Sequence, residues 1–359
     1  MVKTNMKLTK IKTKADGKDD IKVLVIYTGG TLGMIYDAQT DSLVPFDFAQ
    51  IPDNLPEMAR LDFEISVLTF DILLDSSNIN PSIWVQLAKI VGDNYNIYDS
   101  FVILHGTDTM AYTASALSYL LEGLNKPVIL TGAQLPIGVA RTDAKENFIT
   151  ALEISAERNA HNHPMISEVC IYFNSLLLRG NRARKHESVQ FNAFESENYP
   201  VLAEAGVKIE YSKPYIRPYH AEAILKVHEI LDENVVILKL FPGISEKVVR
   251  NILEIKGLRG VVLETFGSGN APTVTWFLDL IKEFSEKGII IFNVSQCNGG
   301  RVMQGHYQTS HSLQELGVVS GADLTTEAAI TKLMFSLGQS ADIQEVKKIL
   351  RRSIAGEMS

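Results

Sequence analysis

The sequence predicts an α/β protein built on parallel sheets with helices on both faces. Short β-branched runs alternate along the chain with longer stretches of helical spacing, which is the pattern of strand–helix–strand units. Several strands end in glycine and polar residues, and in open α/β sheets the ligand crevice lies beyond the carboxyl ends of the strands. We therefore expect these loops to converge. The clearest strand segments are KVLVIY (22–27), FVILH (101–105), PVILTG (127–132), EVCIYF (168–173), VVILKLF (235–241), GVVLETF (260–266) and GIIIFNV (288–294).

The length of 359 residues predicts two domains. The segment GVKIEYSKPYIRPYHAE (206–222) contains two prolines and no clean period, which is typical of a linker. The first 20 residues mix lysines with aspartates and show no apolar periodicity, so we expect a disordered tail. The predicted organisation is a tail (1–20), a large N-terminal α/β domain (21–210), a linker (211–233) and a smaller C-terminal α/β domain (234–359).

Composition argues against several classes of protein. Lys and Arg total 34 against 42 Asp and Glu, so the net charge of -8 gives no reason to expect a nucleic-acid partner. No stretch approaches the roughly 20 apolar residues of a membrane span, and the N-terminus lacks the apolar core of a secretory signal. Cys170 and Cys297 form no Cys-x-x-Cys pair and the histidines show no metal-binding spacing. We expect a cytoplasmic protein without metal or membrane partner.

The first predicted strand runs into the glycine pair Gly29-Gly30, followed by Thr31. Glycines there let backbone N–H groups approach a ligand closely. The spacing matches neither a dinucleotide fingerprint nor a phosphate loop. Two interpretations of Thr31 remain: a hydroxyl nucleophile at the top of a strand, or a residue that caps a helix. The nucleophile is favoured by Thr107, which holds the equivalent position after the FVILH strand and is followed by Asp108.

Six stretches taken together resemble the cytoplasmic type I L-asparaginases, from about Ile21 to the C-terminus. The resemblance implies hydrolysis of L-asparagine to L-aspartate and ammonia through a threonine acyl-enzyme intermediate, with no cofactor. It also implies a homodimer or homotetramer, and an N-terminal domain with a left-handed crossover against the usual rule. The stretches are YTGGTLGM, LLDSSN, FVILHGTDTMAYTASALSYLL, PVILTGAQLP, RGNRARK and FGSGNAP.

The family's functional residues carry over onto matching positions. Thr31 corresponds to the threonine that becomes acylated, and Thr107, Asp108 and Lys185 correspond to the second threonine, the aspartate and the lysine. Asn270 corresponds to a residue that reaches the active site of a neighbouring subunit in related asparaginases. The residues that the resemblance places around the substrate are Gly30, Asp75, Ser76, Ser77, Gly106 and Asn270.

Lys185 poses a chemical difficulty as a base. The ordinary pKa of lysine is about 10.4, and a close Asp108 would favour the charged form further. A neutral Lys185 therefore needs burial, or a proton relay through Thr107 in which its charge varies over the cycle. A third interpretation is a salt bridge to Asp108 as its only role.

The sequence departs from the family at the mobile loop after the nucleophile. Asparaginases carry a tyrosine there, and the matching position, just before Val44-Pro45, is Leu43. Tyr36 lies nearer Thr31 and is one candidate to replace it. Which residue activates Thr31 stays open.

A second departure concerns regulation. Bacterial type I enzymes bind an effector asparagine with a threonine and an arginine, where this chain has Arg184 and Glu264; Gln296 and Cys297, which flank that site, remain. Either Glu264 repels the effector carboxylate, or it pairs with Arg184 and closes the pocket. Both predict no effector bound in the bacterial manner.

Two other functions share these motifs. The asparaginase-like subunit of an archaeal tRNA-dependent amidotransferase normally has an extra N-terminal domain, whereas only about 20 residues precede the first predicted strand here. A non-catalytic amino-acid sensor would not need Thr31, Thr107, Asp108 and Lys185 together.

Overall fold

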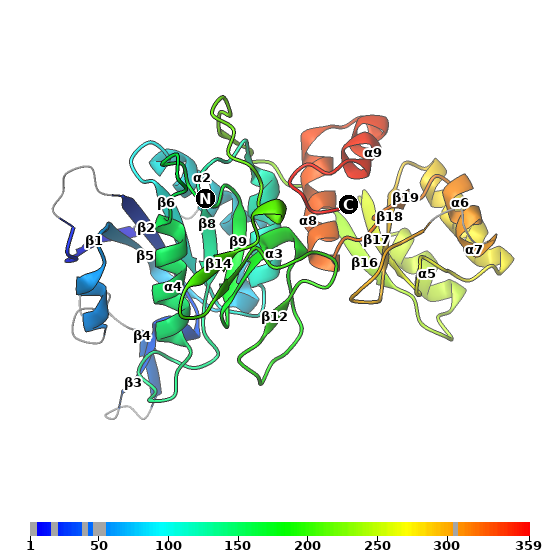
Figure 1. The fold of residues 1–359 in the computed structure, drawn as a ribbon. Helices are drawn as coiled ribbons and strands as arrows, with labels where there is room; N and C mark the ends of the chain where they lie inside the picture. The colour runs from blue at the N-terminus through cyan, green and yellow to red at the C-terminus, as the bar shows by residue number, and fades with distance from the viewer. Residues whose placement is uncertain (1–5, 16–20, 38–41, 46–54, 304–307) are drawn as a thin grey trace. The chain divides into compact units, whose positions relative to one another are not determined.

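The structure, a computed structural model, describes residues 6–15, 21–37, 42–45, 55–303 and 308–359. It divides the chain into two compact units (Figure 1). The first comprises Met1–Ser196 and Pro200–His228, and the second comprises Glu197–Tyr199 and Glu229–Ser359.

The first unit contains a nine-stranded sheet. In spatial order its strands are β1 (Met6–Ile11), β5 (Glu64–Leu74), β2 (Lys22–Gly29), β6 (Ser100–Leu104), β8 (Val128–Thr131), β9 (Val169–Phe173), β10 (Leu176–Arg179), β13 (Ala203–Ala205) and β14 (Ile209–Tyr211). The run from β5 to β9 is parallel, and the strands outside it pair antiparallel. The sequence-based prediction of a parallel sheet is confirmed for this centre, where β6, β8 and β9 are buried along their whole length.

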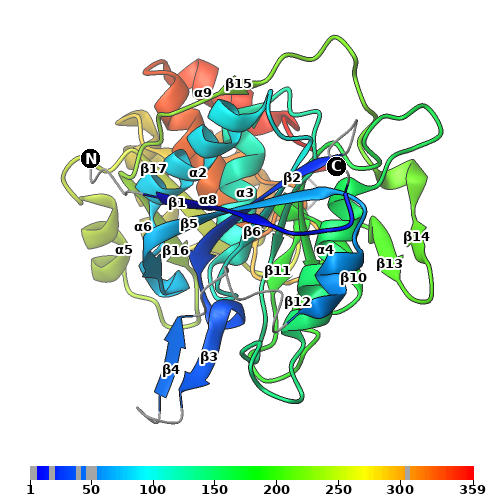
Figure 2. The same cartoon turned by 90° about the vertical axis from the view of Figure 1, so that its left-hand side faces the viewer.

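Helices cover both faces of this sheet (Figure 2). They are α2 (Pro81–Asn94), α3 (Met110–Leu120) and α4 (Ala144–Ala156), with α2 and α3 on the face opposite α4. Helix α2 begins at Pro81, a residue favoured at the first helical position. The Asn80 side chain caps the helix by accepting a hydrogen bond from the Ser82 N–H. Helix α3 ends at Leu120, before Gly123 with its φ of 75°.

Smaller elements surround the sheet. The two-stranded pairs are β3 (Met34–Asp37) with β4 (Ser42–Pro45), β7 (Leu121–Glu122) with β15 (Lys226–Val227), and β11 (Arg184–Lys185) with β12 (Phe194–Glu195). The 3-10 turns are η1 (Thr31–Gly33), η3 (Pro56–Arg60), η4 (Ser76–Asn78), η5 (Gly180–Arg182) and η6 (Lys213–Tyr215).

The N-terminal segment corrects one sequence-based expectation. Residues 6–11 form β1, an edge strand antiparallel to β5 with Met6 opposite Phe70 and Ile11 opposite Ile65. The prediction of a disordered tail is therefore wrong for these residues, while residues 1–5 and 16–20 lie outside the described part. Backbone pairing with a free sheet edge needs no apolar periodicity, and lysines are common on edge strands.

The described part of the second unit contains a four-stranded parallel sheet and five helices. The sheet order is β16 (Val235–Lys239), β17 (Gly260–Thr265), β18 (Ile290–Ser295) and β19 (Val319–Ser320). The helices are α5 (Glu246–Leu253), α6 (Thr275–Glu286), α7 (Gln308–Glu315), α8 (Thr326–Gln339) and α9 (Ile343–Arg351).

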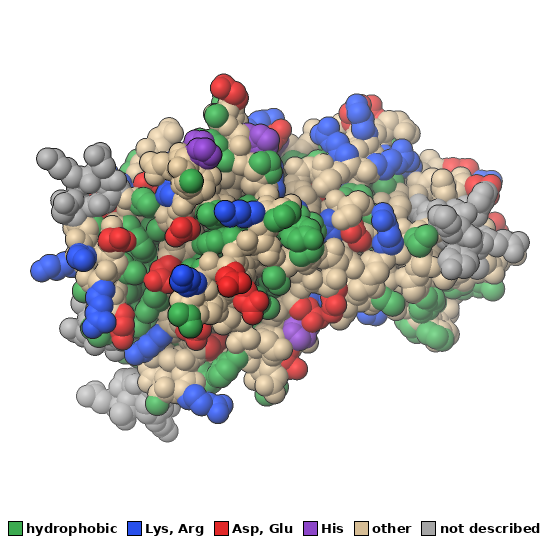
Figure 3. Space-filling model, viewed as in Figure 1, with side chains coloured by type: hydrophobic (Ala, Val, Ile, Leu, Met, Phe, Trp, Pro, Cys, Tyr) green, Lys and Arg blue, Asp and Glu red, His purple; other side chains and the backbone are tan. Residues whose placement is uncertain are grey.

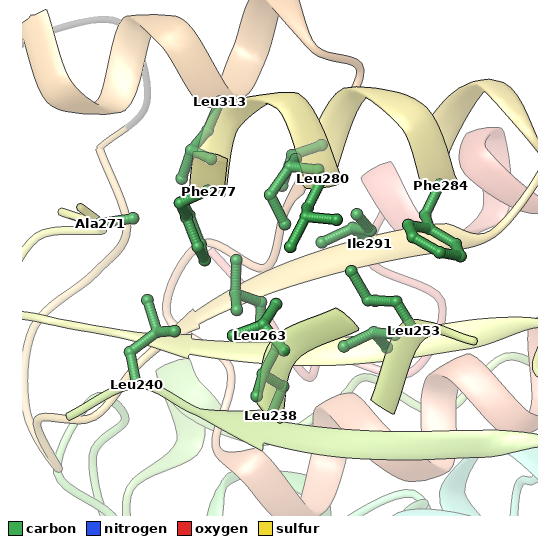
Figure 4. Close-up of a cluster of buried hydrophobic side chains, with 14 of the residues drawn as sticks. Leu238, Leu240, Leu253, Leu263, Ala271, Phe277, Leu280, Phe284, Ile291 and Leu313 are labelled. Carbon is green, nitrogen blue, oxygen red and sulfur yellow. The ribbon is translucent and has the colours of Figure 1, made fainter. Parts of the chain in front are cut away.

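The apolar core of this unit lies between the sheet and α6 (Figure 4). Leu263 of β17 and Ile291 of β18 pack toward Phe277 and Leu280 of α6. On the other face of β17, Leu333 of α8 touches Gly260 so closely that an added Cβ would lie 2.8 Å from it. The sheet is thus covered on both sides, as the buried β-branched strands predicted.

The segment predicted as a linker, 211–233, contributes η6 and β15 to the first unit. Strand β15 pairs with β7, with Val227 opposite Leu121. The chain passes to the second unit at Glu229.

Candidate active site

Three loops at the carboxyl ends of neighbouring strands lie against one another. Gly30, after β2, has a φ of 90°, and a Cβ there would lie 2.5 Å from the backbone nitrogen of Gly106, after β6. A Cβ on Gly106 would in turn lie 2.7 Å from the Ser76 hydroxyl, after β5. The predicted convergence is confirmed for these three loops. Gly30 and Gly106 allow their backbones to approach closely because glycine has no Cβ. That the second-unit loop carrying Asn270 converges with these loops stays a prediction.

Thr31 opens the turn η1 directly after Gly30. It is half-buried, and its hydroxyl has no hydrogen-bond partner among the described residues. The turn is supported from below by Tyr27, whose buried hydroxyl donates to the Gly33 carbonyl at 2.7 Å. Burial raises the pKa of the Tyr27 phenol above its usual value, so it stays a donor. Thr31 is therefore held on a supported turn.

Lys185 joins Thr107 and Asp108 into one hydrogen-bonded set. Its ammonium nitrogen lies 2.9 Å from the Thr107 hydroxyl and 2.7 Å from a carboxylate oxygen of Asp108. The Lys185 side chain is 17% exposed, whereas that of Asp108 is 66% exposed. The geometry contains both the ion pair with Asp108 and the contact with Thr107 that a relay needs.

Gln134 is a neighbour of this set to which the sequence reasoning assigned no role. It follows β8, and its side-chain oxygen lies 3.4 Å from the Thr107 hydroxyl as acceptor. Its side-chain nitrogen donates to the Gln190 carbonyl at 3.0 Å, and its backbone N–H donates to Asp143. The signal was its position at the end of a third parallel strand, in the stretch PVILTGAQLP.

The loop after β5 is ordered by its own side chains. The Asp75 carboxylate accepts hydrogen bonds from the Ser77 N–H at 2.8 Å and from the Ser77 hydroxyl at 2.7 Å. These two donors lower the pKa of Asp75 below its usual value. Ser76 is buried, and its carbonyl accepts from the Thr109 hydroxyl at 2.6 Å. The β5 loop is thus tied to the loop that follows β6.

His105, the last residue before Gly106, is fully buried beneath the same loop. One ring nitrogen, Nδ1, lies 2.7 Å from the Gly106 carbonyl oxygen, and the other, Nε2, lies 2.9 Å from the Thr113 hydroxyl of α3. The Thr113 hydroxyl also accepts from the indole N–H of Trp84 in α2 at 3.0 Å. Burial lowers the pKa of His105 to about 4, against a smaller opposing effect of the Gly106 carbonyl, so the ring is neutral at pH 7.

The two positions weighed for the loop tyrosine lie opposite each other. Strands β3 and β4 form an antiparallel pair next to Thr31, in which Tyr36 is the register partner of Leu43 (Figure 2). Residues 38–41 lie outside the described part.

The candidates for an effector site divide between the two units. Arg184 lies on β11 of the first unit, opposite Glu195. Glu264 lies on β17 of the second unit, where its buried carboxylate accepts from the Thr326 hydroxyl at 2.5 Å and lies 3.5 Å from the ammonium of Lys239. The Glu264 charge is thus partnered within its own unit.

The other residues of the second unit lie at the carboxyl ends of its strands. The side-chain amide of Gln296 donates to the Leu240 and Glu264 carbonyls at 2.6 and 2.8 Å. Cys297 is exposed, and its N–H donates to the Ser295 hydroxyl at 3.0 Å. Asn270 closes the loop after β17 by exchanging backbone hydrogen bonds with Phe266 at 2.8 and 2.9 Å.

Three further observations concern surface charge, metal ligands and membrane-spanning helices. Acidic and basic side chains are interspersed over the face drawn in Figure 3. The described residues contain no group of three or more His, Cys, Asp or Glu placed to hold a metal ion. Among those same residues, every helix is too short or too polar to cross a membrane.

Comparison with known proteins identifies the family. Residues 22–217 match the family "Asparaginase, N-terminal", and residues 234–350 match "Glutaminase/Asparaginase C-terminal domain". The chain is 40% identical to L-asparaginase 1 of Escherichia coli K12 over 338 residues, which cover 94% of this chain and 98% of that protein. It is 38% identical to a mouse protein named 60 kDa lysophospholipase, over 94% of this chain and 62% of the relative.

A solved structure agrees with this assignment. The crystal structure of L-asparaginase I from Vibrio cholerae superposes with a TM-score of 0.85 and 39% identity, over 95% of this chain and 99% of that one. The two family matches, the fold and the relatives point to one conclusion: this chain belongs to the asparaginase family.

Proposed function

We propose that the protein hydrolyses L-asparagine to L-aspartate and ammonia. The observation that carries the proposal is the set formed by Lys185, Thr107 and Asp108, with contacts of 2.9 and 2.7 Å, on a loop that touches the one preceding Thr31. It combines a hydroxyl, a carboxylate and an amine at the strand ends where a small amide can meet Thr31.

The proposed reaction begins with attack of the Thr31 hydroxyl oxygen on the side-chain amide carbon of asparagine. The C–O bond forms, the C–N bond breaks, and the leaving nitrogen takes a proton to depart as ammonia. Water then adds to the ester on Thr31, and breakage of its C–O bond releases aspartate and restores the hydroxyl. Backbone N–H groups of the glycine-bearing loops are suited to stabilise the oxyanion in both steps.

Two groups are candidates for accepting the proton of Thr31. One is a residue of the β3–β4 pair, where Tyr36 is the tyrosine that we weigh. The other is Thr107, whose contact with Lys185 provides an outlet for the proton. For the Thr107 route, Lys185 must be neutral at the moment of transfer.

Substrate recognition follows from the charges of an amino-acid amide. Asp108 would pair with the substrate ammonium, while Ser76, Ser77 and the N–H groups near Gly30 and Gly106 would bind its carboxylate. The pKa of Asp75 is lowered by its Ser77 donors, so its charge persists at neutral pH and orders this loop.

Assembly and location complete the proposal. We infer a homodimer or homotetramer in which Asn270 lies close to a partner's site, a role taken from the family resemblance. We also infer a cytoplasmic enzyme without a cofactor. Light scattering combined with an activity assay tests the assembly, and a fully active monomer would refute it.

The test of the chemistry is ammonia release by wild type and by Thr31→Ala. We expect Thr31→Ala to abolish turnover while the thermal unfolding temperature stays unchanged, because a half-buried hydroxyl makes little packing. Thr31→Ser, which keeps the hydroxyl, is the matched control and should retain activity. A covalent adduct found by mass spectrometry on Thr107 would overturn the assignment of the nucleophile. Fatty-acid release from a lysophospholipid, measured on the same preparations, tests the activity for which one relative is named.

A further inference from the structure

The peptide between Gly106 and Thr107 is held from below by a buried chain of side chains. We propose that Trp84, Thr113 and His105 form a positioning relay, which fixes this peptide so that the Thr107 N–H points away from the buried ring. The inference rests on the proposed function for its effect on turnover. The geometry of the relay stands independently of it.

The donors and acceptors of the relay admit one arrangement only. The indole nitrogen of Trp84 is a donor without acceptor capacity, so the Thr113 oxygen must accept at this 3.0 Å contact. The Thr113 oxygen has a second lone pair, so this end alone allows Thr113 either to donate to Nε2 of His105 at 2.9 Å or to accept from it.

The Gly106 end of the relay decides which ring nitrogen carries the proton. The Gly106 carbonyl oxygen can only accept, so Nδ1 of His105 must carry the proton across their 2.7 Å contact. This contact places a proton on Nδ1, and in the neutral ring Nε2 then accepts the Thr113 proton. Full burial keeps the ring in this neutral state, because it lowers the pKa of His105 to about 4.

The consequence for the active site follows from the planar peptide. In a trans peptide the C=O and the following N–H point in opposite directions. A Gly106 carbonyl drawn toward His105 therefore directs the Thr107 N–H away from the core. That N–H donates to no described residue. The same loop carries the Thr107 hydroxyl that contacts Lys185, so the relay positions the side chain together with the N–H.

Thr113 is the residue at which the relay is tested most cleanly. It lies on α3, is fully buried, and its hydroxyl is hydrogen-bonded to Trp84 and His105. Thr113→Val keeps the shape but removes the hydroxyl, so Nε2 loses its donor and the ring is held only by its Nδ1–H bond to the Gly106 carbonyl. A ring held at one nitrogen fixes the Gly106–Thr107 peptide less firmly.

The expected result is a fall in kcat for asparagine of about 10- to 100-fold in Thr113→Val, with KM changed less than about threefold, because small misplacements of reacting groups carry losses of this size. Thr113→Ser, which keeps the hydroxyl, should restore kcat. Ser118→Ala is the control on the same helix, since its hydroxyl donates to the Ala114 carbonyl at 2.8 Å and takes no part in the relay. Thr113→Ser and Ser118→Ala should unfold at temperatures close to wild type. Thr113→Val should unfold at a lower temperature because the buried Trp84 N–H loses its acceptor, so kcat is compared well below that temperature.

A second measurement reads the ring directly. In protein labelled with ¹⁵N-histidine, the nitrogen shifts of His105, assigned with His105→Gln, should report Nδ1–H in wild type and Thr113→Ser. In Thr113→Val the proton should stay on Nδ1, while the nitrogen shift of Nε2 should change because its hydrogen bond is lost. A wild-type ring protonated on Nε2, a Thr113→Val enzyme with kcat within twofold of wild type, or a Thr113→Ser enzyme as impaired as Thr113→Val would each overturn the relay. If wild type releases no ammonia, the proposed function fails, and the ring measurement alone still decides the tautomer.

Discussion

Replacing Lys332 by methionine is expected to destabilise the second unit severely. The ammonium of Lys332 in α8 lies 2.6 Å from the carboxylate of Glu357, and both side chains are 0% exposed. Lys332 also donates to the Leu350 and Arg352 carbonyls at 3.1 and 2.7 Å. Methionine has nearly the same length but no charge, so the substitution would leave a buried carboxylate without its counter-ion and two carbonyls without this donor.

The magnitude follows from these losses. Breaking a buried ion pair by removing one partner costs about 3–5 kcal/mol, because the remaining charge is uncompensated. With a urea dependence of about 2 kcal/mol per molar, the unfolding midpoint should fall by roughly 1.5–2.5 M. The fluorescence of Trp276 reports on this unit, and Trp84→Phe removes the other tryptophan, which lies in the first unit.

The controls separate the buried pair from lysine loss in general. Lys348→Met removes an ammonium that is 69% exposed and 3.5 Å from Glu345, and we expect a change within about 0.5 kcal/mol. Adding Glu357→Gln to Lys332→Met should recover at least about 1 kcal/mol, since it removes the unpaired charge. A cost of less than about 1 kcal/mol for Lys332→Met, or a double variant less stable than the single one, would refute the reasoning.

Three further predictions concern pH, specificity and regulation. Burial lowers the pKa of His105 from 6.5 to about 4, so on acidification the unfolded chain binds the proton before the folded protein does. The free energy of unfolding should therefore fall by about 3 kcal/mol as the pH decreases from 6.5 to about 4. Urea titrations at several pH values measure this slope, and His105→Gln should flatten it. Asparagine should be preferred over glutamine about 10- to 200-fold in kcat/KM, since one methylene in a tight pocket has this effect, and equal specificity constants would contradict the expected pocket. Steady-state curves for asparagine should be hyperbolic, because Glu264 is an acid already bound by Thr326 and Lys239; a Hill coefficient above one that falls to one in Glu264→Ala would show a working effector site.

The sequence predicted those features that depend on local pattern. Buried parallel strands have apolar, β-branched sequences, which can be recognised without a structure. Each of the predicted strand segments overlaps a strand of the structure. Glycines and hydroxyl residues at strand ends led to loops that do converge, and the motifs brought Lys185 to Thr107 and Asp108. The catalytic roles of these residues remain predictions.

The features that were missed depend on distant contacts. Gln134 reaches Thr107 because β8 lies beside β6, and its position at a strand end did not show which residue its side chain would contact. His105 lies within the motif HGTDT, but its role depends on burial and on partners from two helices. Strand β1 escaped detection because backbone pairing, rather than an apolar face, places it on the sheet.

The edge strand β1 also has a consequence for folding order. It precedes its partner β5 in the chain, and the two are separated by 54 residues at the Ile11–Ile65 pair and by 64 at the Met6–Phe70 pair. Such a distant pairing forms late, because a long loop must close before the contact forms. Until then β5 presents an open row of backbone donors and acceptors, the kind of edge on which chains aggregate. A truncation that begins at Lys22 would make that edge permanent and should lower the soluble yield of the protein.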